Sequence, residues 1–134
     1  MMNKIDHIAF AVSSLDKSVP LFERLLGTPC YKTESVATEK VKTAFFRSGE
    51  SKIELLEGTE SDSVISKFID KNGEGMHHVA FSVEDIHAEI ERLRAAGFQF
   101  ISEIPKMGAD NKLICFLHPK STNGVLVEIC QDIK

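Results

Sequence analysis

The sequence contains no tryptophan, one tyrosine, four prolines and three cysteines among its 134 residues. The cysteines, Cys30, Cys115 and Cys130, are odd in number and lack C-x-x-C spacing. This argues against both a disulfide framework and a thiolate zinc site. Each cysteine lies in or beside an apolar run, so we expect small, buried hydrophobic side chains at these positions.

Two further classes of function are disfavoured by what the chain lacks. The net charge is −4 and charges of both signs are interspersed, so no basic surface indicates binding to nucleic acid or to a membrane surface. No apolar run approaches membrane-spanning length, and the N-terminus lacks the apolar core of a signal sequence. We therefore expect a cytoplasmic protein of one domain, residues 1–134, with no nucleic-acid or membrane partner.

An internal repeat organises the sequence. Segment 76–83 (MHHVAFSV) repeats segment 5–12 (IDHIAFAV), with His78 on His7 at a shift of 71 residues. Each segment opens an apolar run typical of a strand, and each is followed by a short polar turn and a helical pattern that ends in glycine. A repeat of half the chain length predicts two structurally equivalent modules.

The first module, residues 5–56, is predicted to have the element order βαβββ. Ser13 and Ser14 offer an N-cap, Gly27 ends the helix, and Pro20 is expected to kink it or loosen its first turn. The predicted strands are 5–12, an edge strand between 30 and 36, 41–47 and 52–56. A connector helix at about 61–72 follows, with an apolar face made of Val64, Ile65, Phe68 and Ile69.

The second module, residues 76–131, repeats this order. Asp85 caps its helix and Gly97 ends it. The predicted strands are 76–83, 98–104, 112–117 and 125–130, with a turn at 118–124. The fold class is therefore α+β: two βαβββ modules that pair into an eight-stranded, incompletely closed, barrel-like groove.

The fourth strand of each module carries a carboxylate within an apolar run, Glu54 in KIELL and Glu128 in VLVEI. An ionised carboxylate buried among leucines and valines needs a partner. Isolated histidines and glutamates on strands are usually structural or solvated, but here the placement occurs twice. His7, Glu54, His78 and Glu128 therefore predict a divalent-metal site with nitrogen and oxygen ligands. Strand alternation directs His77 away from His78, so we expect it outside the ligand set.

Three segments carry a resemblance to a known family: 71–81 (KNGEGMHHVAF), 52–57 (KIELLE) and 116–128 (FLHPKSTNGVLVE). They are similar to the vicinal-oxygen-chelate (VOC, glyoxalase-like) superfamily, and within it to the methylmalonyl-CoA epimerase family, over essentially the whole chain. The resemblance implies one divalent metal ion (Co²⁺ favoured; Zn²⁺, Ni²⁺, Mn²⁺ or Mg²⁺ as alternatives) and an acyl-CoA thioester substrate. A homodimer is also expected, because relatives cover their sheet edges by pairing chains.

The implied activity is the interconversion of (R)- and (S)-methylmalonyl-CoA by proton transfer at C2 through an enolate, with Glu128 as one catalytic group. The family often places the other acid just before the third strand, followed by Gln. Here the corresponding segment, 37–41, reads ATEKV. Thr38 therefore occupies the position of the family's acid, and Glu39 occupies the position of its Gln. Glu39 is the candidate if a one-residue bulge turns it inward; a flat strand would point it away. A solvated Glu39, with a metal-bound water ordered by Thr38 as the base, is the alternative.

Other readings of the sequence stay open. A glyoxalase I-like lactoylglutathione lyase uses a similar ligand set, and some superfamily members are non-catalytic small-molecule binders, although these usually lack the full set of four ligands. The family segment Gly-Ala-His-Gly is replaced here by GADN at 108–111, which affects one expected substrate contact. Lys120, Ser121 and Thr122 either contact CoA phosphates or form a plain polar turn.

Overall fold

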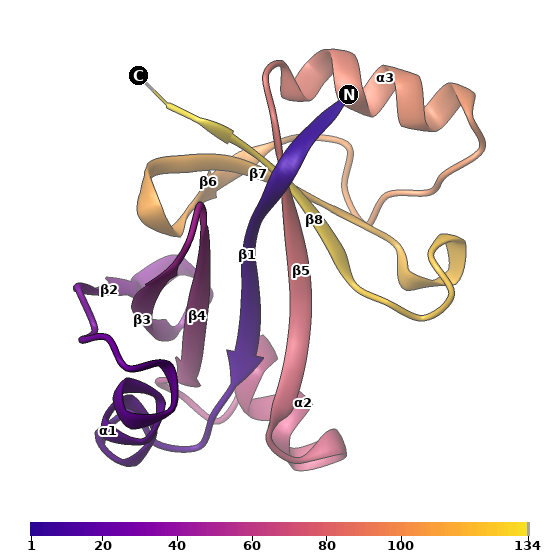
Figure 1. Cartoon of the computed structure of the whole chain (residues 1–134). Helices are drawn as coiled ribbons and strands as arrows, with labels where there is room; N and C mark the ends of the chain where they lie inside the picture. Colours follow the sequence, from indigo (N-terminus) through magenta and orange to yellow (C-terminus); the bar gives the residue numbers. More distant parts are fainter. Residues whose placement is uncertain (134) are drawn as a thin grey trace. The chain divides into compact units, whose positions relative to one another are not determined.

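The computed structural model describes residues 1–133 and shows a mixed α+β protein (Figure 1). It contains three α-helices and eight strands in these residues, in the order βαβββ, α, βαβββ. The strands follow one another in the sheet as β2-β3-β4-β1-β5-β8-β7-β6. This confirms the predicted fold class, and it places β2 at an edge as predicted.

The first module forms as its sequence predicts. Ser14 caps the first helix, with its side chain accepting a hydrogen bond from the Lys17 amide, and Gly27 ends the helix in the left-handed region at φ 69°. The helix continues through Pro20 to its predicted end. The elements are β1 (Met2–Ala11), α1 (Leu15–Leu26), β2 (Lys32–Val36), β3 (Val41–Ser48) and β4 (Ser51–Gly58).

The connector helix is α2 (Val64–Asn72), which begins after the capping residue Ser63 and ends at Gly73. Ile65 is buried, and Phe68 and Ile69 pack beside it against the β1–β4 face. Val64 was expected on the same apolar face, and this was wrong, because its side chain is 63% exposed. Val64 is the first residue of the helix, and the next residue, Ile65, takes the buried position.

The second module consists of β5 (Gly75–Val83), α3 (Ile86–Ala95), β6 (Lys106–Gly108), β7 (Lys112–Leu117) and β8 (Val127–Asp132). The strand expected at 98–104 is not formed: within that segment only Phe100 makes an isolated bridge, to Leu117. Phe98 and Phe100 pack against the core under α3, whereas Ile101 and Ile104 are exposed. The sixth strand forms after Pro105 instead, where three residues pair with β7.

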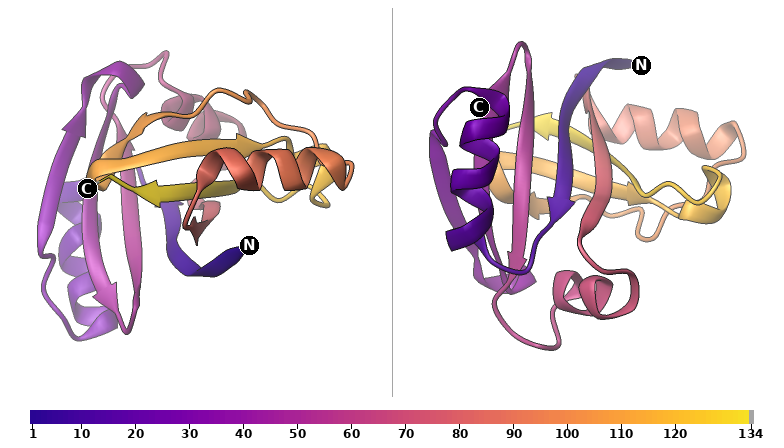
Figure 2. Two further views of the ribbon diagram at one scale, coloured as in Figure 1. Left: turned by 90° about the horizontal axis from the view of Figure 1, so that it is seen from above. Right: turned by 60° about the horizontal axis from the view of Figure 1, so that its bottom comes forward.

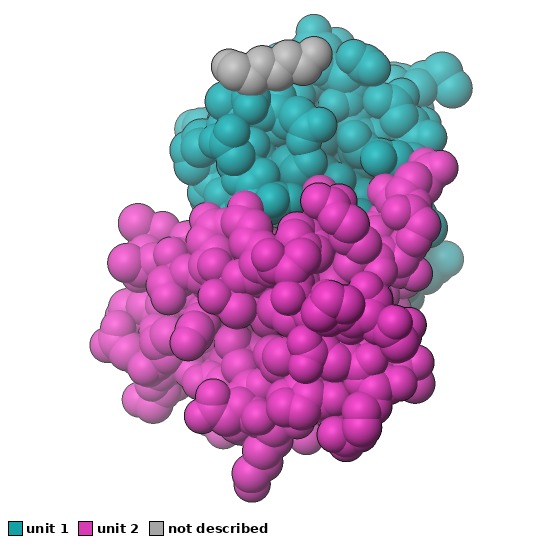
Figure 3. All heavy atoms as spheres, turned by 60° about the vertical axis from the view of Figure 1, so that its left-hand side comes forward, with its two compact units in different colours: residues 1–6, 78–134 teal, residues 7–77 magenta. Residues whose placement is uncertain are grey.

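The chain divides into two compact units (Figure 3): residues His7–His77 form one, called unit 2, and residues 1–6 with the chain from His78 onward form the other, unit 1. In unit 2, α1 lies against one face of β2, β3 and β4 (Figure 2) and encloses a core that includes Phe46 and Leu55. In unit 1, α3 lies along β7 and β8 and encloses Leu117 and Ile129.

These cores fix which way the glutamates face. Glu54 precedes Leu55, and Glu128 precedes Ile129, so strand alternation turns both carboxylates to the face opposite the helix. Cys115 and Cys130 are buried and Cys30 is half-buried, and within residues 1–133 none of the three forms a disulfide. None of the helices in residues 1–133 is long and apolar enough to cross a membrane.

Candidate metal centre

The histidines and glutamates occupy equivalent register positions in the two units. β1 and β4 are parallel and place Ala9 opposite Glu54, two residues beyond His7. β5 and β8 are also parallel and place Ala80 opposite Glu128, again two residues beyond the histidine, His78. Because residues two apart on a strand share a face, each His and Glu lie diagonally on one sheet face.

The other neighbours of the two glutamates are also equivalent. Phe45 of β3 lies opposite Glu54, and Phe116 of β7 lies opposite Glu128, and both pairs are antiparallel. The glutamates are 74 residues apart, although the phenylalanines keep the 71-residue shift of the repeat. The three additional residues therefore lie between Phe116 and Glu128, in the connection between β7 and β8.

Within each unit the imidazole and the carboxylate are in contact. In unit 2, His7 Nε2 lies 3.3 Å from Glu54 Oε1, and in unit 1, His78 Nε2 lies 3.1 Å from Glu128 Oε1. All four residues are buried, with exposed fractions of 4% to 6%. Each buried carboxylate therefore has the partner that burial of its charge requires.

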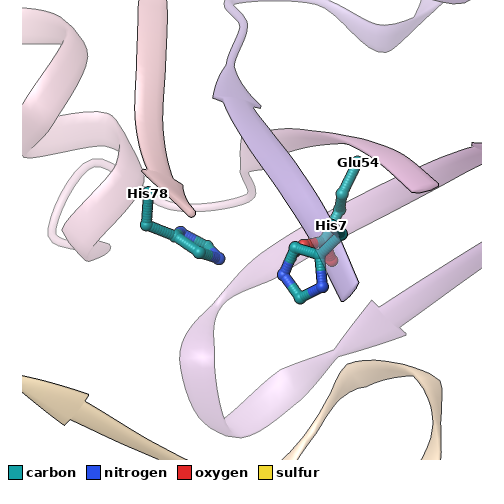
Figure 4. Close-up of side chains that lie close together, drawn as sticks. All are labelled: His7, Glu54 and His78. Atoms are coloured by element: carbon teal, nitrogen blue, oxygen red, sulfur yellow. The ribbon is translucent and has the colours of Figure 1, made fainter. Parts of the chain in front are cut away.

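One ligand atom from each of His7, Glu54 and His78 lies within 4.8 Å of the other two (Figure 4). Zinc-like ions bind nitrogen and oxygen at about 2.0–2.2 Å, which makes the edge of the coordination polyhedron roughly 3.0 Å (octahedral) to 3.4 Å (tetrahedral). The His–Glu separations of 3.3 and 3.1 Å match these edges. These three residues offer two imidazole nitrogens and one carboxylate oxygen, donors that suit a divalent transition metal. Glu128, the fourth predicted ligand, contacts His78 but is not one of the three.

The two adjacent histidines, His77 and His78, contact different aromatic side chains. The Phe116 ring meets the His78 ring edge-on, with centroids 5.4 Å apart at 90°. His77 instead meets Phe68 of α2, with centroids 5.0 Å apart. Adjacent histidines thus contact different elements, which is the behaviour that strand alternation predicts.

A buried ion pair lies directly before the first histidine. Lys112 Nζ lies 3.3 Å from Asp6 Oδ1 and also donates to Asp132, which faces Lys112 across β7 and β8. Burial disfavours the ammonium, but its hydrogen bond to Asp132 and the charges of both aspartates outweigh this effect and raise the pKa of Lys112. The pair therefore anchors the middle of β1, one residue before His7.

Glu39 lies in a 3₁₀ turn, Ala37–Glu39, between β2 and β3, and its side chain is half-buried. Neither the flat strand nor the one-residue bulge considered for this segment describes it. The following Lys40 adopts a left-handed conformation at φ 54°. A second 3₁₀ turn, Ala109–Asn111, precedes β7 and contains Asp110, 71 residues from Glu39. The GADN segment is thus the structural repeat of the Glu39 turn.

The turn after β7 satisfies its own polar groups. Ser121 Oγ donates to the His118 carbonyl at 2.9 Å, and Thr122 Oγ1 donates to the Val125 carbonyl. The Lys120 amide donates to His118 Nδ1 at 3.1 Å. These contacts support the polar-turn interpretation of Lys120, Ser121 and Thr122.

Two cations beside the site were missed in the sequence. Lys52 of β4 lies opposite His7, and Arg47 of β3 lies opposite Lys52. Strand alternation alone could have found Lys52, since it is two residues from Glu54 and must share its face. Identifying Arg47 as a neighbour of the site also requires the register of the β3–β4 hairpin.

Comparisons with known proteins agree on one superfamily. A sequence profile described as the glyoxalase/bleomycin resistance protein/dioxygenase superfamily matches residues 6–116. An uncharacterized protein of Bacillus subtilis (strain 168), YqjC, is 39% identical over 130 residues, 97% of this chain and 93% of that protein. An ethylmalonyl-CoA/methylmalonyl-CoA epimerase of Cereibacter sphaeroides is 37% identical over 133 residues, 98% of this chain and 99% of that protein.

Solved structures give the same result. The crystal structure of methylmalonyl-CoA epimerase from Mycobacterium tuberculosis matches with a TM-score of 0.94 at 30% identity, covering 99% of this chain and 90% of that one. A methylmalonyl-CoA epimerase in complex with methylmalonyl-CoA and NH4⁺ matches with a TM-score of 0.91 at 33% identity, covering 98% of this chain and 96% of that one.

Proposed function

Because the chain belongs to the glyoxalase/bleomycin resistance protein/dioxygenase superfamily, we propose that it is a metal-dependent methylmalonyl-CoA epimerase. The observation that carries the proposal is the buried His–Glu pair that occurs once in each unit at the same register position. This pair occurs in a chain that is 37% identical, over nearly its full length, to an ethylmalonyl-CoA/methylmalonyl-CoA epimerase. The substrate is then an acyl-CoA thioester that carries a free carboxylate.

His7, Glu54, His78 and Glu128 would hold the metal, and the donor chemistry and the His–Glu separations fit a divalent ion. The ion, with Co²⁺ favoured, supplies Lewis-acid stabilisation of the negative charge that develops on the thioester oxygen, a contribution of several kcal/mol. Burial of the four side chains keeps water from competing for the same positions.

Epimerisation requires that the proton on C2 leaves from one face and that a proton returns to the other. Two groups on opposite sides of a planar intermediate are therefore needed, each typically contributing about 10²–10⁴-fold. Glu128 is proposed as one of them, since its buried carboxylate is held by the His78 imidazole. Glu39 is proposed as the other, since its half-buried carboxylate lies in the turn that leads into β3.

The test compares two adjacent histidines. His78→Ala should abolish binding of one equivalent of Co²⁺ and the epimerisation of methylmalonyl-CoA, because it removes one of four ligands. His77→Ala, the matched control, should retain metal content, because His77 contacts Phe68 instead. Metal content is measured by elemental analysis after dialysis, and epimerisation by deuterium incorporation and chiral analysis.

Two outcomes would contradict the proposal. Equal loss of metal in both variants would refute the register argument for the site. A metal-loaded protein that is inactive on methylmalonyl-CoA but converts the hemithioacetal of methylglyoxal and glutathione would replace the epimerase by a lactoylglutathione lyase.

A further inference from the structure

The turn that leads from β1 into α1, residues 12–15, is held by two glutamate side chains from distant parts of unit 2. The Leu15 amide donates to Glu57 Oε1 at 2.6 Å, and the Ser13 amide donates to Glu74 Oε2 at 2.8 Å. Leu15 is the first residue of α1, so its amide has no acceptor within the helix. Hydrogen bonds to an ionised carboxylate are stronger than those between neutral groups. The two glutamates therefore fasten the turn firmly.

This turn is joined to the strand of each of the three clustered ligand candidates. β1, which carries His7, runs directly into the turn. β4 carries Glu54 three residues before Glu57, and β5 carries His78 four residues after Glu74. One short segment thus connects the positions of all three strands along the chain.

The segment that leads into β5 needs such a side-chain contact. Glu74 lies between Gly73 and Gly75, and Gly73 adopts a left-handed conformation at φ 79°. Glycine on both sides gives the backbone more conformational freedom than other residues would allow. The hydrogen bond from Ser13 to Glu74 therefore restricts a segment that its own backbone leaves free to move.

The second unit repeats the contact of Glu57 with a neutral side chain. Gln131 of β8 lies 74 residues after Glu57, the same shift that separates Glu128 from Glu54. Its Oε1 accepts a hydrogen bond at 2.8 Å from the amide of Ile86, the first residue of α3. Because Gln serves in one unit and Glu in the other, the position requires an acceptor oxygen rather than a charge.

We propose that Glu57 and Glu74 are positioning residues for the metal site. By fastening β4 and the start of β5 to the turn after β1, they hold Glu54 and His78 at the spacing from His7 that one ion needs. This inference rests on the proposed metal-dependent function. Glu57 is three residues from Glu54 and so takes the opposite face of β4, away from the ligands. Small shifts of the strands matter because metal–ligand distances are tolerated only within about 0.2 Å.

The test measures equilibrium binding of Co²⁺ to protein freed of metal by a chelator. Calorimetry gives the affinity, and the visible absorption of bound Co²⁺ reports the ligand geometry. Glu57→Met and Glu74→Met remove the acceptor oxygen. Each should weaken Co²⁺ binding by about 10-fold, the lower end of the effect of losing a residue that orients ligands, and should alter the spectrum. Glu57→Gln and Glu74→Gln keep an acceptor oxygen and should retain most of the affinity.

Asp70→Asn is the matched control for loss of charge. Asp70 is exposed in α2, four residues before Glu74. The substitution removes a carboxylate from the same region and leaves both hydrogen bonds of the turn in place, so Co²⁺ binding should be unchanged. The melting temperature of each variant in chelator identifies any that fail to fold. Glu74 is exposed, so its variants are expected to fold even if Glu57→Met does not.

Two results would overturn the inference while the metal site stands. In the first, the folded Met variants melt at lower temperature but keep the Co²⁺ affinity and spectrum of the natural protein, so that the contacts stabilise the fold alone. In the second, the Met, Gln and Asp70→Asn variants all weaken binding equally, which would assign the effect to charge.

These measurements need no turnover, so they separate this inference from the proposed function. A protein whose Co²⁺ affinity depends on Glu57 and Glu74 but that does not epimerise methylmalonyl-CoA retains the inference and loses the function. One that epimerises, with Co²⁺ affinity unchanged in both Met variants, retains the function alone. A natural protein that binds no Co²⁺ or other divalent ion would overturn both.

Discussion

Lys112 provides the sharpest test of how the middle of β1, beside His7, is held in place. Its ammonium lies between Asp6, at 3.3 Å, and Asp132, and its side chain is 7% exposed. We predict that Lys112→Met destabilises the protein, because the Asp6 side chain, 4% exposed, would remain buried without this cation. Asp132 is 64% exposed and can turn to water, so it adds little to the loss.

The magnitude follows from which partner remains buried. Removing one member of a buried ion pair costs about 3–5 kcal/mol, against about 0–1 kcal/mol for an exposed pair. For a chain of this length, that corresponds to a decrease in melting temperature of roughly 10–20 °C. Asp132→Asn should therefore have a small effect and Lys112→Met a large one. The pKa of Lys112 is raised above 10.5, so its contribution is complete below pH 10.5 and declines as the pH rises through the folded-state value.

The assay is urea unfolding at pH 7 in the presence of a chelator, so that metal binding does not shift the midpoint. Lys42→Met, at an exposed lysine, is the control and should change the free energy of unfolding by less than about 0.5 kcal/mol. Asp6→Asn combined with Lys112→Met should be more stable than Lys112→Met alone, because the Asp6 position then carries no buried carboxylate. If Lys112→Met unfolds within about 1 kcal/mol of the natural protein, the buried-pair reasoning is wrong.

Glu89 of α3 is buried, and Arg92 donates to both of its oxygens, at 3.0 and 2.7 Å, which lowers its pKa to about 2. The Glu89–Arg92 pair therefore stabilises the fold above pH 4.5, and this contribution is lost as the pH falls towards 2. Arg92→Met should reduce the dependence of the melting temperature on pH between pH 5 and 2. A variant with the same pH dependence as the natural protein would contradict this. For the catalytic proposal, Glu39→Gln should abolish interconversion of the two epimers while metal content stays intact, because Gln cannot accept the C2 proton. Deuterium should still enter from the face that Glu128 serves, and near-normal interconversion in Glu39→Gln would place the second base elsewhere.

The sequence by itself determined the two modules and the face of the candidate ligands. Both follow from local patterns: the 71-residue repeat, the capping serines and glycines, and the alternation that separates Glu54 from Leu55. The repeat was especially informative because two similar segments adopt the same register. The positions of Glu54 and Glu128 relative to the histidines could therefore be inferred without knowing the pairing. Shared ligation of one metal by the four residues, and the catalytic role of Glu39, stay predictions.

Tertiary structure alone decided which apolar and charged residues are covered. Segment 98–104 has the composition of a strand, but the α3 core takes Phe98 and Phe100, and β7 pairs instead with three residues beyond Pro105. Lys112 reads as an ordinary surface lysine, yet it meets Asp6, 106 residues away. Arg47 lies opposite Lys52 only because the β3–β4 hairpin sets the register of the two strands. The periodicity of a sequence segment indicates which face of its own helix or strand a residue occupies. Whether that residue is buried or paired with a charge depends on which distant element packs against that face, and only the folded chain determines this packing.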